Sequence, residues 1–281
     1  MSVVAFYTCG KDQTGNTASA ISLATYMGIV QNKRVLFIST ALNNSEIKKA
    51  LWPTQTVKKG LFGMNTNYGA GVNDNGIEGL DRIIRSNRIS PDIITDYTRV
   101  ALKGRLEILQ GYNGSEEQYK EIQKQYMQII SLAKQIYDTV IVDIDKELEA
   151  KTKLEILNGV DIVVAMATQK IDSISNVIRT MAEGVAFKKS NSILTIGKYD
   201  DKSKYNAKNI SRNILRTKDI INTVPYNTIL FEEMQEGRLI DMFLRFLNLS
   251  EKDENTFFVD EIKRLKEDID KKEALIRQVI K

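Results

Sequence analysis

The chain has 281 residues, of which 42% are hydrophobic, and its 40 basic and 36 acidic residues give a formal net charge of +4. The apolar fraction suffices for one large core, while the small charge excess does not by itself indicate a nucleic-acid-binding protein. Histidine is absent and Cys9 is the single cysteine, which excludes an internal disulfide framework, histidine catalysis and the common zinc sites. No apolar run approaches the roughly 20 residues of a membrane span, so we expect a cytoplasmic protein.

Short apolar segments alternate with helical stretches, the pattern of parallel strands joined by crossover helices. The predicted strands are Val3–Thr8, Arg34–Ile38, Leu106–Leu109, Thr139–Asp143, Asp161–Ala167, Ile193–Ile196 and Ile220–Val224. The predicted helices between them are Thr17–Val30, Glu116–Ile136, Ser173–Phe187 and Ala207–Leu215. Because each strand is almost wholly apolar, we expect an α/β fold of three layers, with a mostly parallel sheet covered by helices on both faces.

Two segments interrupt this alternation. Residues Gly60–Gly79 contain many of the 16 glycines, among asparagines, and are predicted to form a long surface loop. The charged segment Glu254–Lys281 has no glycine or proline and is predicted to form a helical tail. We therefore divide the chain into a main domain, residues 1–250, and a C-terminal helix within residues 251–281.

The predicted tail carries an apolar stripe with alternating spacings of four and three, which Lys272 interrupts. The stripe comprises Phe258, Ile262, Leu265, Ile269, Ile276 and Val279. It fits a helix packed on its own domain, a seam for a partner or second copy, or a membrane-surface helix. The polar face mixes acidic residues with lysines and lacks the basic bias that binding to anionic lipid favours.

A phosphate-loop frame, G-x-x-x-x-G-K-[ST], lies between the first predicted strand and its helix. It comprises Gly10, Lys11, Asp12, Gln13, Thr14, Gly15, Asn16 and Thr17, with Ala18 next on the helix. Glycines let backbone N–H groups turn toward phosphate oxygens, and the helix N-terminus adds partial positive charge. Thr17 stands where a hydroxyl binds Mg²⁺. Asn16 stands where a lysine is expected, and its uncharged amide weakens the stabilisation of phosphate charge.

The early lysine makes this loop resemble the deviant Walker loop, K-G-G-x-G-K-T, of the ParA/MinD superfamily of P-loop ATPases. Lys11, Gly15 and Thr17 match that pattern, whereas Asp12 and Gln13 replace two glycines. The resemblance implies ATP and Mg²⁺ as cofactors. It also implies a homodimer in which Lys11 reaches the phosphates held by the partner subunit, which is the one catalytic contribution expected from this loop.

The resemblance continues over residues 1–250. Ser39 and Ala41 occupy two aspartate positions of the family's first switch, and the second of those aspartates orients the attacking water in the family. The strand that ends at Asp143 resembles the Walker B strand, Y-D-x-[IV]-[IV]-[IV]-D. A carboxylate there holds Mg²⁺ through water, so Asp143 is the strongest metal-site candidate, with Asp145 as a helper. An aspartate that simply caps the following turn is the alternative.

Further motifs correspond to the family's adenine end. Gly197 replaces the asparagine that contacts adenine in the family pattern L-N-R-Y-D. The family's P-Y-N loop beside the adenine corresponds to Pro225, Tyr226 and Asn227. Together with Phe231–Arg245, this loop is closest to the TadZ/CpaE-like branch, atypical ATPases that position pilus and secretion machinery. The motifs are degenerate, but their order and spacing are specific.

Four basic residues recur at every fourth position near the helix predicted at Ala207–Leu215, namely Lys204, Lys208, Arg212 and Arg216. An α-helix would place them on one face. ParA relatives use basic surface to hold DNA nonspecifically through its phosphates, and that contact is salt-sensitive. A solvated helix face is the alternative, because carboxylates nearby dilute the positive field.

Three functions follow from these motifs. The first, which we favour, is an ATP-binding switch or scaffold with slow or absent hydrolysis. It dimerises round nucleotide and positions a pilus, secretion or conjugation assembly, whose components recruit it to the inner face of the membrane. The second is an active ParA-like ATPase that partitions DNA or cargo, against which the missing residues argue. The third is an interaction domain that no longer binds nucleotide.

Overall fold

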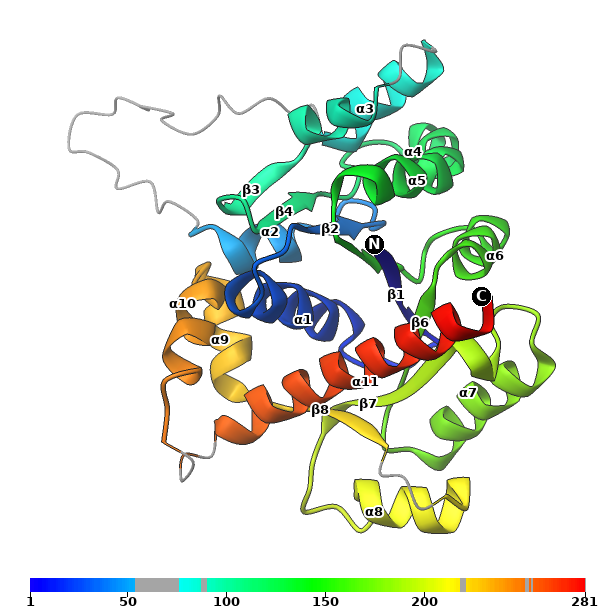
Figure 1. Ribbon diagram of the computed structural model, residues 1–281, viewed down its shortest axis with the longest axis vertical. Coiled ribbons are helices and arrows are strands. Elements are labelled where there is room, and N and C mark those ends of the chain that lie inside the picture. Colours follow the sequence, from blue (N-terminus) through cyan, green and yellow to red (C-terminus); the bar gives the residue numbers. More distant parts are fainter. Residues whose placement is uncertain (54–75, 87–89, 218–220, 251–252, 254, 281) are drawn as a thin grey trace.

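The computed structural model describes residues 1–53, 76–86, 90–217, 221–250, 253 and 255–280. Its framework is one eight-stranded sheet, drawn as arrows in Figure 1. The strands are β1 (Ser2–Thr8), β2 (Val35–Ser39), β3 (Arg99–Leu102), β4 (Leu106–Leu109), β5 (Thr139–Asp143), β6 (Ile162–Ala167), β7 (Ser192–Tyr199) and β8 (Asn222–Pro225).

The strand order is β3-β4-β2-β5-β1-β6-β7-β8. Every neighbouring pair is parallel except β3 and β4, which are antiparallel. Parallel neighbours require crossover connections, and the helices between the strands supply them. The mostly parallel sheet predicted from the sequence is confirmed.

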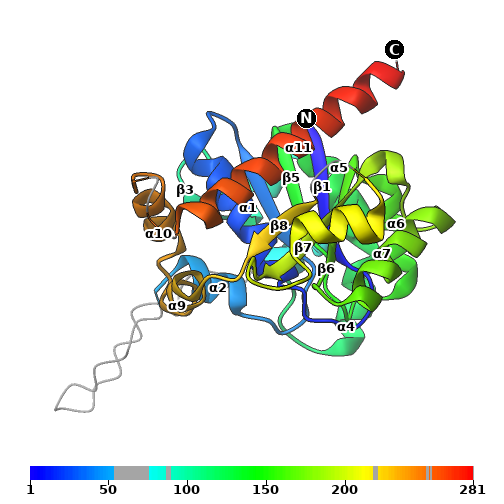
Figure 2. The same cartoon turned by 90° about the horizontal axis from the view of Figure 1, so that it is seen from below.

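Helices cover both faces of this sheet, as Figures 1 and 2 show. They are α1 (Asn16–Val30), α2 (Glu46–Leu51), α3 (Gly76–Arg85), α4 (Glu116–Ile122), α5 (Tyr126–Ile136), α6 (Ala150–Gly159), α7 (Ile171–Glu183), α8 (Ala207–Asn209), α9 (Thr228–Glu236), α10 (Leu239–Phe246) and α11 (Thr256–Ile280). Short 3₁₀ turns lie at Pro91–Tyr97, Gln123–Gln125 and Lys189–Asn191, and a π-helical turn lies at Ile210–Leu215. The three-layer arrangement agrees with the sequence.

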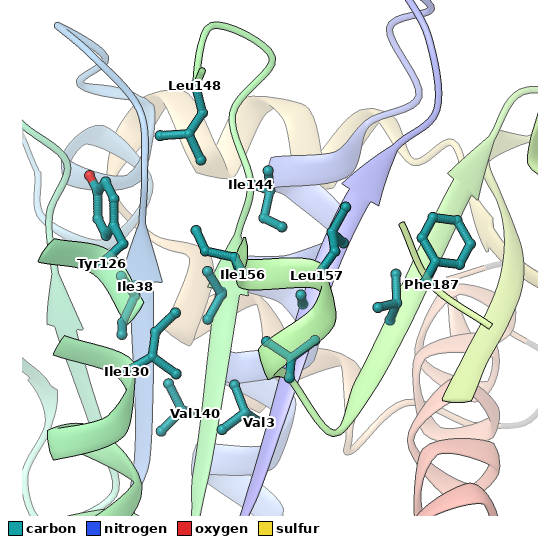
Figure 3. Close-up of a cluster of buried hydrophobic side chains, with 14 of the residues drawn as sticks. Val3, Ile38, Tyr126, Ile130, Val140, Ile144, Leu148, Ile156, Leu157 and Phe187 are labelled. Atoms are coloured by element: carbon teal, nitrogen blue, oxygen red, sulfur yellow. The ribbon is translucent and has the colours of Figure 1, made fainter. Parts of the chain in front are cut away.

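Side chains alternate along each strand, so the buried apolar residues form two cores, one on each face of the sheet. Val3 and Ala5 of β1 belong to one core, and Val4 and Phe6 belong to the other. The second core also receives α1, α10 and α11. Figure 3 shows part of the first core, in which α5 and α6 pack on the sheet through Tyr126, Ile130, Ile156 and Leu157.

The C-terminal helix α11 packs against its own chain. Both views show it lying beside α1 and β8 (Figures 1 and 2). The first part of its apolar stripe is fully buried in the second core, and Ile276 is partly buried there. The side chain of Val279 lies outside the described residues. The fully buried positions are Phe258, Ile262, Leu265 and Ile269, so this part of the stripe does not face a partner.

Several element boundaries differ from the sequence predictions. The predicted loop Gly60–Gly79 falls outside the described residues up to residue 75, and its end is helical because α3 starts at Gly76. On α3, the apolar side chains of Ile77, Leu80 and Ile84 are buried and follow helical spacing. The predicted helix Glu116–Ile136 is divided into α4 and α5 by a 3₁₀ turn. The short antiparallel strand β3 and the helices α2, α6, α9 and α10 were not predicted.

No helix within the described part of the chain combines the length and the apolar character of a bilayer span.

Candidate nucleotide site

The candidate residues gather at the carboxyl ends of the central strands, where ligands bind in open α/β sheets. The loop after β1 begins at Cys9, and Asp143 closes the neighbouring strand β5. Parallel pairing sets Asp143 opposite Phe6 of β1 and opposite Ser39 of β2. The sheet therefore brings together residues that are far apart in the sequence.

The loop between β1 and α1 contains two glycines in the left-handed region of backbone space, which side-chain-bearing residues rarely adopt. Gly10 has φ of 106° and Gly15 has φ of 77°. The hydroxyls of Thr8 and Thr14 lie 2.6 Å apart and tie the start of the loop to its end. Thr14 is fully buried, whereas Lys11 and Gln13 are exposed. The loop thus keeps a fixed turn while exposing its early lysine.

The N-terminus of α1 is open toward this loop. Gly15 occupies the N-cap position and has no side chain to accept a hydrogen bond from the first turn, and that turn contains no acidic residue. Most helices cap these amides with a side-chain oxygen, because the first four N–H groups have no partner within the helix. An uncapped start without a nearby carboxylate on the same turn suits a bound anion.

Asp143 accepts hydrogen bonds from both residues that start α1. Thr17 Oγ1 donates to Asp143 Oδ2 over 2.9 Å, and Asn16 Nδ2 donates to Asp143 Oδ1 over 2.7 Å. The same amide donates to the carbonyl oxygen of Phe6 over 3.2 Å. The following turn is capped by Asp145 instead, whose Oδ1 accepts from the N–H of Glu147. Asp145 is therefore used in the turn, and Asp143 faces the loop.

The environment of Asp143 fits a divalent cation. Burial raises the pKa of Asp143 to about 7, although the hydrogen bonds from Thr17 and Asn16 oppose the rise. The carboxylates of Glu46 and Asp145 raise it further. A cation would favour the ionised form, and a hydroxyl and a carboxylate are oxygen donors of the kind that Mg²⁺ prefers. Asn16 Oδ1 adds a buried oxygen that has no partner among the described residues.

Two charged residues that sequence analysis did not select also lie at this site. Glu46 starts α2, is close enough to Asp143 to raise its pKa, and interacts with Lys198. Lys198 lies against Gly15: a Cβ added to that glycine would be 3.3 Å from Lys198 Cγ and 3.7 Å from Lys198 Cε. Lys198 stands at the arginine position of the pattern L-N-R-Y-D and Glu46 lies in no motif, but only the fold brings β7 and α2 to the loop.

Solved structures share this architecture along nearly the whole chain. The structure of a ParA family ATPase from Chlorobium tepidum superposes with a TM-score of 0.68 at 14% sequence identity, covering 96% of this chain and 98% of that one. The chain has the ParA/MinD fold. No protein-family model matches the sequence, and no curated protein matches it.

Two further ParA/MinD-fold structures contain nucleotide. The septum site-determining protein MinD from Pyrococcus horikoshii, complexed with Mg-ADP, has a TM-score of 0.63 at 14% identity and covers 94% of this chain and 95% of its own. A plasmid partition protein from Borrelia burgdorferi, bound to AMPPNP, has a TM-score of 0.58 at 17% identity and covers 95% and 99%. The assignment to the TadZ/CpaE-like branch stays a prediction.

The first-switch segment of this ParA/MinD fold is held by backbone contacts rather than by carboxylates. Ser39 Oγ accepts from the N–H of Ala41 over 3.3 Å. Gly111 approaches Ala41 so closely that an added Cβ would lie 2.2 Å from the Ala41 carbonyl oxygen. Asn43 exchanges two hydrogen bonds with the backbone of Gly114, at 2.9 Å and 2.8 Å. Ser39 and Ala41, at the two positions where the family pattern predicts aspartates, therefore have structural contacts and no charge.

The two charged side chains at the start of the loop, Lys11 and Asp12, differ in their surroundings. Asp12 forms an ion pair with Lys170 at 3.3 Å, which offsets a carboxylate that would repel phosphate. Lys11 projects from the exposed part of the loop, as a contact in trans requires.

The adenine end departs furthest from the family pattern. A Cβ on Gly197 would lie 2.0 Å from the carbonyl oxygen of Thr14, so the loop packs directly on the strand at the position where the family pattern has asparagine. Asn227 Oδ1 caps α9 by accepting from the N–H of Leu230 over 2.8 Å, and its amide donates to Asn255. Pro225 ends β8 in the core, and Tyr226 is 60% exposed. Of the three residues predicted to lie beside the adenine, Tyr226 is the one whose aromatic ring is exposed.

The basic residues predicted to share one α-helix do not lie on one continuous α-helix. Lys204 precedes α8, where its ammonium lies 5.1 Å from the ring centroid of Tyr205. The turn that follows is π-helical, and its wider spacing breaks the four-residue repeat. Arg216 ends this turn in the left-handed region, with φ of 53°. The regular α-helix on which the predicted cationic face depended is therefore limited to Ala207–Asn209.

Proposed function

We propose that this chain is an ATP-binding switch or scaffold with slow or absent hydrolysis, which dimerises round Mg²⁺-bound nucleotide. The proposal rests mainly on one arrangement, the uncapped start of α1 beside the Thr17–Asp143 pair. The loop lacks the lysine expected at Asn16, but it keeps the turns at Gly10 and Gly15. These turns let backbone N–H groups face a phosphate.

In this proposal the backbone N–H groups of Gly10–Thr17 hold the phosphates, and Thr17 and Asp143 hold Mg²⁺. The metal, when bound, offsets phosphate charge, which is the chemistry that a P-loop site gains from it. Pro225, Tyr226 and Asn227 lie on the base side, with Tyr226 offering its ring as a stacking surface. Lys11 extends toward the phosphates of a second copy.

Slow or absent hydrolysis follows from two positions. Asn16 brings no positive charge, and its amide is bound to Asp143 and to the backbone of Phe6. Ala41 has no group that orients water. Phosphoryl transfer depends on positioned charge and an oriented nucleophile, so losing both lowers turnover more than binding.

The output we propose is a dimerisation signal to a larger assembly of the pilus, secretion or conjugation type, following the TadZ/CpaE-like resemblance of residues 225–245. A partner-bound relative supports an assembly role in general. MinD from Aquifex aeolicus has been solved in complex with MinC, with a TM-score of 0.55 at 15% identity. We place the protein in the cytoplasm, recruited to the inner face of the membrane by its partners.

An interaction domain without nucleotide binding is the second candidate. One observation favours it, the hydrogen bond from Asn16 to Asp143, because it occupies the carboxylate without any cation. Asp12 also places a carboxylate in the loop, although Lys170 pairs with it.

Calorimetric titration with ATP, with and without Mg²⁺, tests the proposal. We expect binding that strengthens in Mg²⁺, and a phosphate-release assay that gives little or no turnover. Asn16→Lys should increase ATP affinity or hydrolysis, because it restores a cation to the loop. Absence of binding would support the interaction domain, and turnover comparable to active ParA-type enzymes would support a partitioning ATPase.

Lys11→Ala tests the dimer. We expect nucleotide-dependent dimerisation, followed by light scattering, to be lost, while the free energy of unfolding changes by less than about 0.5 kcal/mol because the side chain is exposed. Lys202→Ala, at another exposed lysine, should retain dimerisation. A dimer that forms equally well with Lys11→Ala would rule out the contact in trans.

A further inference from the structure

Lys198 occupies an unusual backbone position at the carboxyl end of β7. Its φ is 49°, in the left-handed region that few residues with a side chain adopt. The pairing of β7 with β8 shifts register between Gly197 and Tyr199, which makes Lys198 the bulged residue. Bulges beside functional sites commonly redirect a side chain, and a strained residue there points to a role.

The redirected side chain lies along the phosphate loop. Both Cγ and Cε of Lys198 are within 4 Å of the place where a Cβ on Gly15 would stand. The ammonium group is one bond beyond Cε, and Lys198 is exposed to solvent. Its charge therefore lies beside Gly15, the residue that opens α1.

The loop itself lacks this charge. Asn16 stands at the lysine position, and its amide is turned to Asp143 and Phe6. Asp143, Asp145 and Glu46 make the surroundings acidic. A phosphate group entering this region needs a cation, and lysine supplies a compact charge with three donors.

We propose that Lys198 supplies, from the end of β7 and within the same subunit, the phosphate-binding positive charge that Asn16 has removed from the loop. This inference rests on the proposed nucleotide binding. The bulge brings the ammonium across Gly15, and Gly197 beside it allows the loop to close on the strand, since any side chain there would strike the Thr14 carbonyl. In this proposal the phosphate-binding charge comes from a neighbouring strand rather than from the start of α1.

Affinity for the non-hydrolysable analogue AMPPNP, measured by calorimetry in Mg²⁺, tests the proposal. Lys198→Met, which keeps the length of the side chain, should weaken binding about tenfold or more, the effect of losing one hydrogen bond to a charged group. Lys198→Arg should stay within about threefold of the wild type because the charge is kept. Lys202→Met, an exposed lysine in the following turn, should bind as the wild type does.

A double-mutant cycle with Asn16→Lys gives the sharper test, because two groups that serve one phosphate are not additive. In the Asn16→Lys background, Lys198→Met should cost less than about threefold, since the loop lysine takes over. An equal cost in both backgrounds would overturn the proposal.

Glu46→Gln separates phosphate binding from a simple ion pair. Lys198→Met should weaken AMPPNP binding in the Glu46→Gln background as well. If Glu46→Gln restored full affinity to Lys198→Met, the role of Lys198 would be to offset Glu46, and the proposal would be wrong. If the wild type binds and Lys198→Met binds equally, only this inference fails. If the wild type binds no nucleotide, the proposed function fails with it.

Discussion

The predicted phosphate end and the predicted adenine end of the candidate site depart from the family pattern in different ways. At the phosphate end, Asn16 and Ala41 carry no charge where the family pattern has lysine and aspartate. The turn formed by Gly10 and Gly15 and the hydrogen bond from Thr17 to Asp143 are nevertheless present. At the predicted adenine end, Gly197 packs so closely on the loop that no side chain fits where the family pattern has asparagine.

This difference follows from what each end uses for recognition. Phosphate is held largely by backbone N–H groups and a helix N-terminus, which survive side-chain replacement. A base is recognised by side chains, so one substitution removes the contact and the space can be refilled. We therefore expect a protein that depends on phosphate and metal more than on the identity of the base.

The largest expected effect concerns the adenine end. Gly197→Asn restores the residue of the family pattern but should lower the free energy of unfolding by about 3 kcal/mol, because the new Cβ would strike a backbone carbonyl in a packed region. That carbonyl, of Thr14, would be 2.0 Å away. Urea unfolding followed by circular dichroism measures the change, and no gain in ATP affinity should accompany it.

Gly76→Ala is the matched control, because no atom of the described residues lies within 4 Å of its added Cβ and its φ is not in the left-handed region. It should leave stability unchanged or raise it slightly. A Gly197→Asn variant as stable as the wild type would show that the loop moves away easily, and the adenine end would then not be closed.

The sequence predicted seven strand segments and the position of the loop because apolar runs, glycines and a strand-terminal aspartate are local signals. It did not predict β3, whose residues Arg99–Leu102 are partly exposed at the sheet edge. It also predicted one α-helix over Ala207–Leu215, since no local pattern indicates the π-helical turn at Ile210–Leu215.

Within the site, the sequence located Thr17 and Asp143 but not Lys198. The proximity of Lys198 to Gly15 depends on the order β1-β6-β7 and on a bulge, and both are properties of the assembled sheet. Asn227 illustrates the opposite case. Its motif suggested a base contact, whereas the packing of α9 uses the side chain as a cap.

The second prediction concerns the phosphate end without metal. Burial raises the pKa of Asp143 to about 7, above its value in the unfolded chain, so ionisation disfavours the folded state. Stability should therefore fall as pH rises from about 4 to 7 and level off above that range. Linkage gives a loss of about 2–3 kcal/mol between pH 5 and pH 8 from this group.

Asp143→Asn removes the ionisable group and keeps an oxygen acceptor, so its stability in Mg²⁺-free buffer should depend less on pH by that amount. Urea unfolding at several pH values measures it, with the exposed Asp201→Asn as a control that keeps the wild-type profile. If the free energy of unfolding depended on pH equally in Asp143→Asn and the wild type, ionisation of Asp143 would not destabilise the folded state, and the prediction would be wrong.

The smallest effect tests whether Asn227 serves the helix or the base. Because Asn227 Oδ1 accepts from the N–H of Leu230, Asn227→Ala should cost about 1 kcal/mol of stability, the usual value of an N-cap. Asn227→Ser should recover most of it, since serine caps equally well. ATP affinity should stay within about twofold in both variants, a change of about 0.4 kcal/mol. If Asn227→Ala left stability unchanged but weakened ATP binding, Asn227 would bind the nucleotide instead of capping α9. The adenine end would then, like the phosphate end, retain a nucleotide-binding residue.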